Sequence, residues 1–436
     1  MLLHNRILIV GTIPYNKNTS SRAFDAYFHN WEKENIRQIF SNTKTPVRGH
    51  CESLYQITDQ RLLKKRLHKI DEVGKVFYDK DLPDDWVSGD LEVGNIVTNY
   101  LYKIGSKDTP LKYLLRKKLW EEKYWNTEQL RNWLDEFNPE CVFLAFSDDF
   151  FIPEIAMFVA NRFNIPIMSC IGDDYYFNDK KSVSPFYHIY RKKYKKLIRE
   201  VFKHKSSAIY ISDKIRDKYN SEFGLNGDTV YLSSEIERHE FKPINTKNPV
   251  ISYCGNIRLG RNTSLIDVAL SFQKINSDYK VDVYSAEKNK EFIKPLTDCS
   301  AIRYHGLVPY SKVIEVMQDS DIVLIVEGFE KKQVDTVKYS LSTKAADAMA
   351  TGSQILVYGD MDCGVISYME YTECAVVCTK LEELATNIHT LLFDIDLQKR
   401  LYFQSKKISK KNHDKNRNLT LSEHLIETLI SNKEEK

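Results

Sequence analysis

Short runs of apolar residues recur along this chain, and segments with helical spacing separate them. Neighbouring positions within each run are both apolar, which predicts parallel strands buried on both faces rather than half-exposed strands. The alternation of such strands with helices predicts an α/β fold built on doubly wound parallel sheets. The clearest predicted strands cover residues 6–10, 141–146, 166–171, 321–326 and 354–358.

Residues 321–359 carry the most information about chemistry, because they predict a strand, a long loop, a helix and a second strand. Ser342 and Thr343 form the predicted N-cap, residues 344–350 are good helix formers, and Gly352 suits the helix end. A helix that begins at the carboxyl end of a strand offers free N–H groups and a positive dipole end to an anion. This pattern predicts a phosphate site.

A similar strand, glycine-containing loop and helix begin at residues 250–253. The loop carries Gly255 and Asn256, followed by Arg258 and Arg261. Because a guanidinium group can hold phosphate oxygens through paired N–H donors, this loop is the second predicted phosphate-binding element.

The first strand, residues 6–10, leads into a loop rich in Gly, Pro and Asn. Thr19, Ser20 or Ser21 can cap the helix that follows, and Arg22 lies in its first turn. The glycine pattern G-x-G-x-x-G of dinucleotide-binding proteins is absent after this strand, which argues against an NAD enzyme. By its position, the loop is predicted to bind a ligand.

Two carboxylates, Asp173 and Asp174, follow the predicted strand at residues 166–171. Ligands of open α/β sheets bind outside the carboxyl ends of strands, so these side chains are placed to accept a hydrogen bond from a ligand hydroxyl. A helix cap or a surface turn explains the same residues equally well.

The length of 436 residues predicts two domains, because single cores rarely grow this large. Residues 241–249 have the proline and polar content of a linker between them. A net charge of +3, with 42% hydrophobic residues, describes an ordinary globular protein and does not call for nucleic acid as a partner.

The eight cysteines are scattered, without C-x-x-C pairs or the spacing of a zinc site. Reduced, buried thiols in a cytoplasmic protein are therefore expected. No apolar stretch reaches the roughly 18 residues of a membrane span, and the chain enters its first strand without a signal-peptide pattern.

Residues 185–205 are strongly basic, with apolar residues at three- and four-residue intervals. This composition fits an amphipathic helix whose basic face meets anionic headgroups or a polyphosphate carrier. An ordinary solvated helix is the alternative.

The segment from Ser342 to Gly352 resembles the donor-site helix of the GT-B retaining glycosyltransferases of family four, which begins an E-A-M-A-x-G signature. Asp347 stands at the acidic position, and Glu327 lies near an earlier glutamate of that family, at a longer spacing than E-x7-E. The loop from Gly255 to Arg261 is similar to the family's donor-diphosphate loop. In the first loop, Thr19, Ser20 and Ser21 replace its paired glycines.

The resemblance implies a GT-B fold, in which two Rossmann-like doubly wound parallel-sheet domains face a cleft and C-terminal helices cross back to the N-terminal domain. It implies an acceptor domain at residues 1–240, a linker at 241–249, a donor domain at 250–400 and a returning helical segment at 401–436. The implied donor-binding residues are Gly255, Asn256, Arg258, Arg261, Glu327, Ser342, Thr343, Lys344 and Asp347. The implied acceptor-binding residues are Thr12, Ser20, Ser21, Arg22 and Asp174, and the implied catalytic residues are Asp173, Asp174, Arg258 and Arg261.

The function that the resemblance implies is retaining transfer of a hexose-type sugar from a nucleotide sugar, expected to be UDP-linked, to a glycan or lipid-linked saccharide. No metal and no other cofactor is implied. Such an enzyme would act in cell-surface polysaccharide biosynthesis, in the cytoplasm or as a peripheral protein at the inner face of the cell membrane.

Two alternatives stay open at the level of sequence. A metal-dependent GT-A transferase needs D-x-D, and the chain contains Asp319-Ser320-Asp321 and Asp360-Met361-Asp362. A non-catalytic GT-B accessory subunit of a glycosyltransferase complex would keep the fold and lose the donor contacts. The departures at Glu327 and Asp347 keep this second alternative open.

Overall fold

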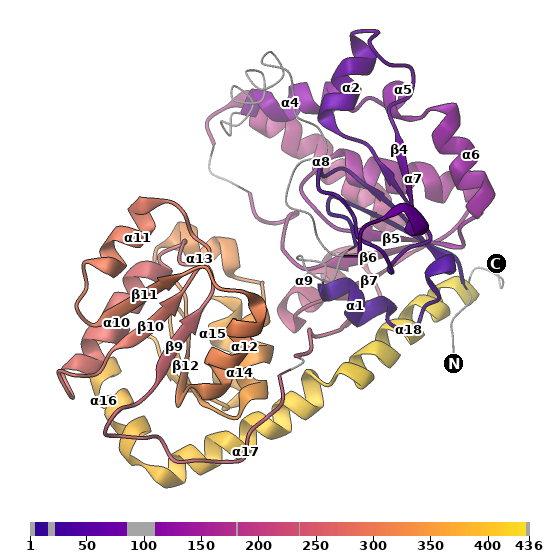
Figure 1. The fold of residues 1–436 in the computed structure, drawn as a ribbon. Helices are drawn as coiled ribbons and strands as arrows, with labels where there is room; N and C mark the ends of the chain where they lie inside the picture. The colour runs from indigo at the N-terminus through magenta and orange to yellow at the C-terminus, as the bar shows by residue number, and fades with distance from the viewer. Residues whose placement is uncertain (1–4, 16–21, 85–109, 180–181, 235, 433–436) are drawn as a thin grey trace. The chain divides into compact units, whose positions relative to one another are not determined.

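The computed structural model describes residues 5–15, 22–84, 110–179, 182–234 and 236–432. The chain divides into two compact units (Figure 1). The first comprises residues 1–230 together with 419–436, and the second comprises residues 231–418. The linker expected at residues 241–249 lies within the second unit, next to its first strand.

The described residues of the first unit form an eight-stranded sheet with the order β4-β3-β2-β1-β5-β6-β7-β8. All neighbouring strands are parallel except β3 and β4. Strand order reverses between β1 and β5, which is the topological switch point of such a sheet. The strands are β1 (Ile7–Gly11), β2 (Ile36–Phe40), β3 (Ser53–Gln56), β4 (Lys75–Tyr78), β5 (Cys141–Ala145), β6 (Ile167–Ile171), β7 (Ser206–Tyr210) and β8 (Asp228–Thr229).

Helices cover both faces of this sheet, as the doubly apolar strands require (Figure 1). The helix α7 packs against β1 and β5, while α1 and α18 share a buried apolar cluster with Ile7 and Ile9 on the other face. The helices are α1 (Arg22–Phe28), α2 (Asp59–Arg66), α4 (Pro110–Leu119), α5 (Glu122–Trp125), α6 (Glu128–Phe137), α7 (Phe151–Phe163), α8 (Pro185–Lys203), α9 (Asp213–Phe223) and α18 (Lys415–Ser431), with 3-10 turns at Lys33–Asn35 and Asp79–Asp81.

The C-terminal helix α18 returns to the first unit after the second unit ends at Asn418. Ile426 is fully buried in the same cluster as the α1 residues Tyr27 and Phe28. The Ser422 hydroxyl donates to the carbonyl of Ala26 at 3.5 Å. The C-terminal crossing that the resemblance implied is therefore confirmed.

The second unit holds a six-stranded parallel sheet with the order β11-β10-β9-β12-β13-β14, whose switch point lies between β9 and β12. Its strands are β9 (Ile251–Cys254), β10 (Val281–Tyr284), β11 (Ile302–Gly306), β12 (Ile322–Val326), β13 (Gln354–Tyr358) and β14 (Val376–Cys378). Its helices are α10 (Arg261–Gln273), α11 (Lys290–Thr297), α12 (Tyr310–Asp319), α13 (Lys331–Val337), α14 (Thr343–Thr351), α15 (Gly364–Thr372), α16 (Leu381–Phe393) and α17 (Ile395–Asn412).

The central strand β12 shows why its sequence is apolar throughout. Ile322, Leu324 and Val326 enter the core formed with α10, α11 and α16. Val323 and Ile325 enter the opposite core, formed with α12, α14 and α15. Because side chains alternate between the faces of a strand, helices on both faces require an apolar residue at every position.

One expectation needs correction, since the long loop predicted between β12 and α14 contains the helix α13. Glu330 and Gln333 form a capping box at its start, in which each side chain accepts a hydrogen bond from the backbone N–H of the other residue. Glutamate is a less common cap than Ser, Thr, Asp or Asn, so the signal was easy to miss.

All eight cysteines are free thiols in the structure. Five of them are buried: Cys51, Cys141, Cys363, Cys374 and Cys378.

Candidate functional site

The switch point between β9 and β12 brings two loops of the second unit together. One loop follows Cys254 and leads to α10, and the other follows Val326 and leads to α13. Neighbouring strands that send their connections to opposite faces of a sheet leave a crevice at their carboxyl ends. The residues predicted to bind a donor diphosphate lie on these loops and at the start of α14.

Arg261, the first residue of α10, forms a two-bonded ion pair with Glu327 at the end of β12. Its Nε and Nη2 donate to the carboxylate oxygens at 2.8 and 2.9 Å. Both side chains are largely buried, with 11% and 3% of their surfaces exposed. Removing either partner would leave a buried, uncompensated charge, so this pair fixes the geometry of the crevice.

Lys344, in the first turn of α14, reaches β9 from the other side of the switch point. Its ammonium group donates to the hydroxyl of Tyr253 at 2.7 Å and lies 4.4 Å from the centre of the tyrosine ring. Burial and the nearby charge of Arg261 lower the pKa of Lys344 to about 8. An anion bound beside this group would favour its charged form and raise that pKa again.

Gly255 provides the space that Lys344 occupies. A Cβ atom at this position would lie 2.3 Å from Cε and 2.7 Å from Nζ of Lys344. The backbone φ of +149° also disfavours a side chain here. The backbone conformation thus favours glycine here, and a side chain at this position would have to displace the flexible end of Lys344.

The beginning of α14 is formed as the sequence predicts. Ser342 is the N-cap, and its hydroxyl accepts a hydrogen bond from the backbone N–H of Lys344 at 3.4 Å. Thr343 is the first helical residue, and Gly352 ends the helix with a φ of +92°. The helix start therefore adds its dipole to the charge of Lys344.

Other expected donor residues are held elsewhere in the second unit. Arg258 is 55% exposed and forms an ion pair with Glu287, while Asn256 accepts a hydrogen bond from the Arg258 backbone at 2.7 Å. Asp347 is buried on α14 and accepts a hydrogen bond from the Ser234 hydroxyl at 2.6 Å. The structure thus groups Arg261, Glu327 and Lys344 more tightly than these three.

Sequence reasoning missed Tyr253 and Gln333. Tyr253 is fully buried, and its hydroxyl accepts a hydrogen bond from Lys344. The sequence feature that could have identified it is an aromatic residue two positions before the loop glycine. Gln333 packs so closely that a Cβ atom on Gly260 or Gly328 would lie 2.3 or 2.2 Å from its amide oxygen. Only the folded α13 brings Gln333 to these glycines.

In the first unit, the expected acceptor residues are only partly described. The carbonyl of Thr12 accepts a hydrogen bond from the backbone of Asn42 at 2.8 Å, just beyond the end of β1. Ser20 and Ser21 lie outside the described residues. Arg22 begins α1, but its side chain also lies outside what the structure describes.

Asp174 is buried after β6 and is bound within the fold. Its Oδ1 accepts hydrogen bonds from the Tyr219 hydroxyl at 2.9 Å and from the backbone of Phe177 at 2.8 Å. Burial raises the pKa of Asp174. Asp173 is exposed, and the Tyr175 hydroxyl donates to it at 3.4 Å. Of the two carboxylates, Asp173 is the one that faces solvent.

The first D-x-D string precedes a strand, whereas the second follows one. Asp321 precedes β12, and its Oδ2 accepts a hydrogen bond from the backbone of Val250 at 2.9 Å. After β13, Asp360 accepts a hydrogen bond from the Asp362 backbone at 2.9 Å, and Lys338 lies 3.5 Å from Asp362. Within the described ranges, no three His, Cys, Asp or Glu residues form a group that could hold a metal ion.

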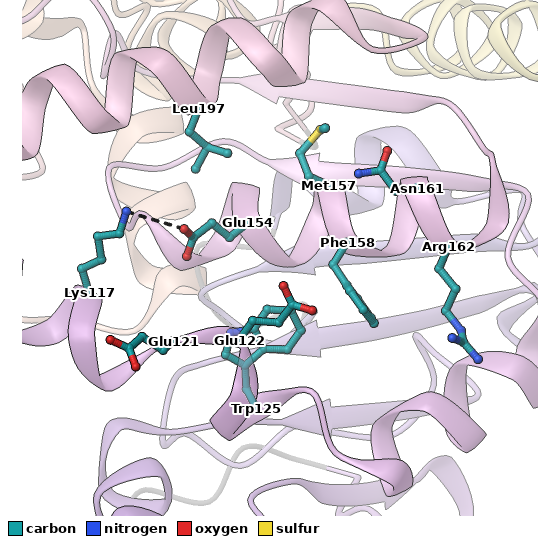
Figure 2. Close-up of a pocket in the computed structure, with 10 residues that line it drawn as sticks. All are labelled: Lys117, Glu121, Glu122, Trp125, Glu154, Met157, Phe158, Asn161, Arg162 and Leu197. Atoms are coloured by element: carbon teal, nitrogen blue, oxygen red, sulfur yellow. Dashed lines mark ion pairs between the residues drawn. The ribbon is translucent and has the colours of Figure 1, made fainter.

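A cavity of about 740 Å³ lies among α4, α5, α7 and α8 of the first unit (Figure 2). Lys117 and Glu154 face each other across it at 3.8 Å, and Trp125 and Phe158 meet edge to face at its wall. Burial raises the pKa of Glu154 to about 7. None of the residues predicted to bind donor or acceptor lines this cavity.

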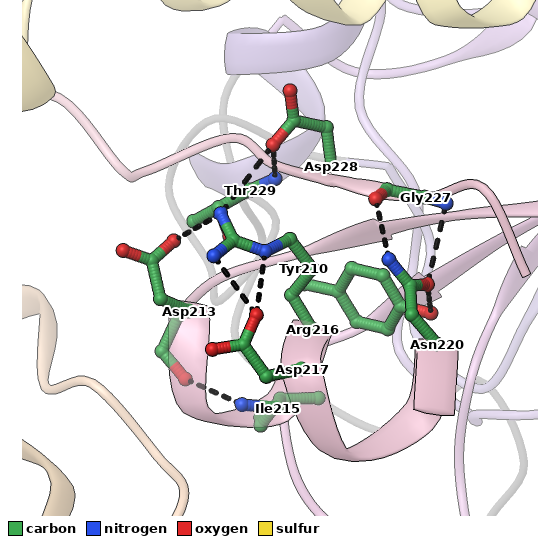
Figure 3. A network of polar contacts seen from close by, with 10 residues as sticks. Tyr210, Asp213, Ile215, Arg216, Asp217, Asn220, Gly227, Asp228 and Thr229 are labelled. Atoms are coloured by element: carbon green, nitrogen blue, oxygen red, sulfur yellow. Dashed lines mark hydrogen bonds and ion pairs between the residues drawn. The ribbon is translucent and has the colours of Figure 1, made fainter. Parts of the chain in front are cut away.

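A polar network on α9 is satisfied within the fold (Figure 3). Arg216 forms ion pairs with Asp213, Asp217 and Asp228 at 2.7, 2.9 and 3.6 Å. The Asn220 side chain accepts a hydrogen bond from Tyr210 at 2.8 Å. The network joins α9 to the edge strand β8, which explains its charges without a ligand.

No family model matches the chain, and no curated protein matches it in sequence. Solved structures do match it along its length. HepE from Anabaena in complex with UDP-glucose is 11% identical with a TM-score of 0.58, over 98% of this chain and 100% of HepE. Sucrose-phosphate synthase from Thermosynechococcus elongatus is 9% identical with a TM-score of 0.59, over 98% and 100% of the two chains.

An α,α-trehalose-phosphate synthase (UDP-forming) from Burkholderia vietnamiensis gives a similar result. It is 8% identical with a TM-score of 0.55, over 98% of this chain and 100% of the synthase. At these identities the likeness establishes the fold alone, and it does so across both units.

Proposed function

The chain has the GT-B fold, and on this premise we propose that it is a glycosyltransferase that takes its sugar from a nucleotide-sugar donor. The observation that carries the proposal is the pair of partly buried cations, Lys344 and Arg261, at the switch point of β9 and β12. With the carboxylate of Glu327, these groups leave one net positive charge beside the start of α14. A diphosphate is the anion that such a site fits.

UDP is the proposed nucleotide. HepE was solved with UDP and with UDP-glucose, and the trehalose-phosphate synthase is described as UDP-forming. A hexose donor and retention of anomeric configuration are proposed from the same resemblance.

The site explains how the donor bond would break. When the anomeric C–O bond breaks, its electron pair stays on the diphosphate, whose negative charge grows. Lys344, Arg261 and the first N–H groups of α14 would stabilise that charge because the fold holds them in place and partly shields the two cations from water. The acceptor hydroxyl attacks the same face of the sugar and gives its proton to the departing phosphate oxygen. This route keeps the configuration and needs no separate nucleophile.

The remaining donor residues take supporting roles in the proposal. Asp347, with Asn256, would bind on the nucleoside side, and Ser342 with Thr343 would present the helix N–H groups. Arg258 is 55% exposed, and to contact the donor it would exchange its ion pair with Glu287 for the diphosphate.

The acceptor is proposed to meet the first unit at the carboxyl ends of β1 and β6. Thr12, Ser20, Ser21 and Arg22 follow the first of these strands, and Asp173 with Asp174 follow the second. A glycan or lipid-linked saccharide at the cytoplasmic face of a membrane is the proposed acceptor, and cell-surface polysaccharide biosynthesis the proposed pathway.

Thermal unfolding with UDP, GDP, CMP and their sugars, each with and without EDTA, tests the donor proposal. A ligand at about 100 times its dissociation constant adds about 2.7 kcal/mol, which raises the midpoint by about 5 °C or more for a unit of this size. We expect a shift with UDP compounds that survives EDTA.

Two variants sharpen the result. Lys344→Met should remove the UDP shift, whereas Lys312→Met, which breaks an exposed ion pair with Glu315 in the same unit, should retain it. No shift with any nucleotide would contradict the proposal and favour an accessory subunit.

A further inference from the structure

The helix α8 concentrates positive charge on the first unit. Among residues 185–203 there are seven Lys and Arg side chains and a single Glu, so this helix carries a net charge of +6. The whole chain carries only +3. The rest of the protein is therefore net negative, and the charge of α8 stands out against it.

The buried face of α8 accounts for part of this charge. Arg191 donates to Asp179 at 2.7 Å and to the carbonyls of Tyr175 and Tyr176, and Lys195 also pairs with Asp179. These two cations hold the turn after β6 to the helix. Arg199 lies 5.7 Å from the centre of the Tyr176 ring and belongs with them. The exposed lysines that remain are Lys192, Lys193, Lys196 and Lys203.

The outer face of α8 combines lysines with apolar residues. Lys192, Lys193 and Lys196 are exposed. Phe186 and Ile189 are 45% and 47% exposed at the N-terminal end of the same face. Phe186, Ile189, Lys193 and Lys196 follow one another at intervals of three and four residues, which places them on one side of a helix.

Such a face is poorly explained by solvent alone. Removing a large apolar side chain from water is favourable, yet Phe186 and Ile189 are exposed beside lysines instead of being packed in a core. Val183, just before the helix, is fully exposed and extends the apolar end. A surface that offers both anionic groups and an apolar layer satisfies both kinds of residue at once.

We propose that the outer face of α8 docks on the surface of an anionic lipid bilayer. Lys192, Lys193 and Lys196 contact the negatively charged headgroups, and Phe186 and Ile189 enter the boundary between headgroups and acyl chains. Membrane contact is then peripheral, since no helix in the described part of the chain is long and apolar enough to span a bilayer. The inference stands on this surface and is independent of the donor site in the second unit.

Co-sedimentation of the full chain with vesicles tests the proposal. One set of vesicles contains phosphatidylcholine alone, and the other contains roughly 30% phosphatidylglycerol to supply the negative surface potential. We expect binding to the anionic vesicles only, weakened when salt rises from about 0.1 to about 0.5 M because the Debye length shortens.

The charge-reversal variant K192E/K193E/K196E should weaken binding at least about 100-fold, since each lysine near an anionic surface contributes about fivefold. The matched control K406E/K407E/K410E makes the same change on the basic helix α17 of the second unit and should bind like the wild type. F186S/I189S should keep the salt-sensitive part of binding and lose the part that persists at high salt. Circular dichroism checks that each variant is folded.

Equal binding to neutral and anionic vesicles would overturn the proposal, as would an equal loss in the α17 control. Binding to soluble heparin but not to anionic vesicles would also overturn it and would assign α8 to a soluble polyanion. UDP binding is measured on the same variants, and its retention by the α8 variant separates the two proposals.

Discussion

The ammonium group of Lys344 occupies the space that a side chain on Gly255 would need. Their closeness, with 2.3 Å between the Lys344 Cε and a Cβ added to Gly255, ties the loop after β9 to the start of α14. Both residues were expected to bind the donor, and the structure shows that the end of the Lys344 side chain fills the space beside Gly255. Predictions about the site follow from this dependence.

Gly255→Ala should displace Lys344 and weaken UDP binding by about tenfold or more, with a stability loss of about 1–3 kcal/mol from overpacking and strain. Gly306→Ala is the matched control, because Gly306 has a φ of +73° in the same unit and no atom within 4 Å of an added Cβ. Calorimetric titration with UDP measures the difference. Unchanged UDP affinity in Gly255→Ala would contradict the proposal that Lys344 contacts the donor.

Glu327→Gln should lower the free energy of unfolding by about 2–4 kcal/mol, since it leaves the buried charge of Arg261 without its partner. The same change removes a negative charge from the crevice, so the folded variant should bind UDP more tightly. Denaturant unfolding with and without UDP measures both effects. Glu315→Gln, in an ion pair with Lys312 whose two side chains are both more than half exposed, should change stability little. Weaker UDP binding in Glu327→Gln would contradict the charge argument.

UDP affinity should fall as pH rises through about 8, the value to which burial and Arg261 lower the pKa of Lys344. The unfolded chain holds this proton up to about pH 10.5, so Lys344 makes stability rise with pH between about 8 and 10.5. Lys344→Met should abolish that slope and the pH dependence of UDP binding. Titration calorimetry in buffers of different ionisation enthalpy should also detect proton uptake on binding near pH 8, and no uptake would contradict the assignment.

Glu154 should make the first unit less stable as pH rises. Burial raises its pKa to about 7, so the folded state holds a proton that the unfolded state releases near pH 4.5. The contribution of Glu154 to the free energy of unfolding is therefore complete below about pH 4.5 and is lost as pH rises through 7. It amounts to about 2 kcal/mol once screening by solvent is included. Glu154→Gln should flatten the unfolding free energy across that window. An unchanged slope would show that Glu154 is already ionised at acid pH.

Asp174→Ala should destabilise the first unit by about 2–3 kcal/mol, because the Tyr219 hydroxyl and the Phe177 backbone lose their acceptor. Asp174→Asn keeps one carbonyl oxygen and should cost less. If the role of Asp174 is to support the fold, the Asn variant should keep transferase activity, while Asp173→Ala, at the exposed carboxylate, should lower it. A large activity loss in a stable Asp174→Asn protein would instead indicate that Asp174 contacts the reacting sugar.

Apolar strands are local signals, and for that reason the sequence predicted much of the second unit. The strand Gln354–Tyr358, the cap at Ser342 and the terminal Gly352 lie where the pattern placed them, because capping and burial on two faces constrain neighbouring residues directly. The GT-B fold implied by the resemblance is confirmed. The metal-dependent GT-A alternative is wrong, since the chain forms two separate Rossmann-type sheets.

Contacts between segments far apart in the chain were decided only by tertiary structure. The sequence by itself determined that Arg261, Glu327 and Lys344 follow strands or open a helix, and so share one edge of a sheet. It could not determine that Arg261 binds Glu327 while Arg258 binds Glu287, or that Asp174 is buried under Tyr219. Side-chain pairing depends on how helices pack across the sheet, and that packing joins residues whose separation in sequence carries no periodic signal.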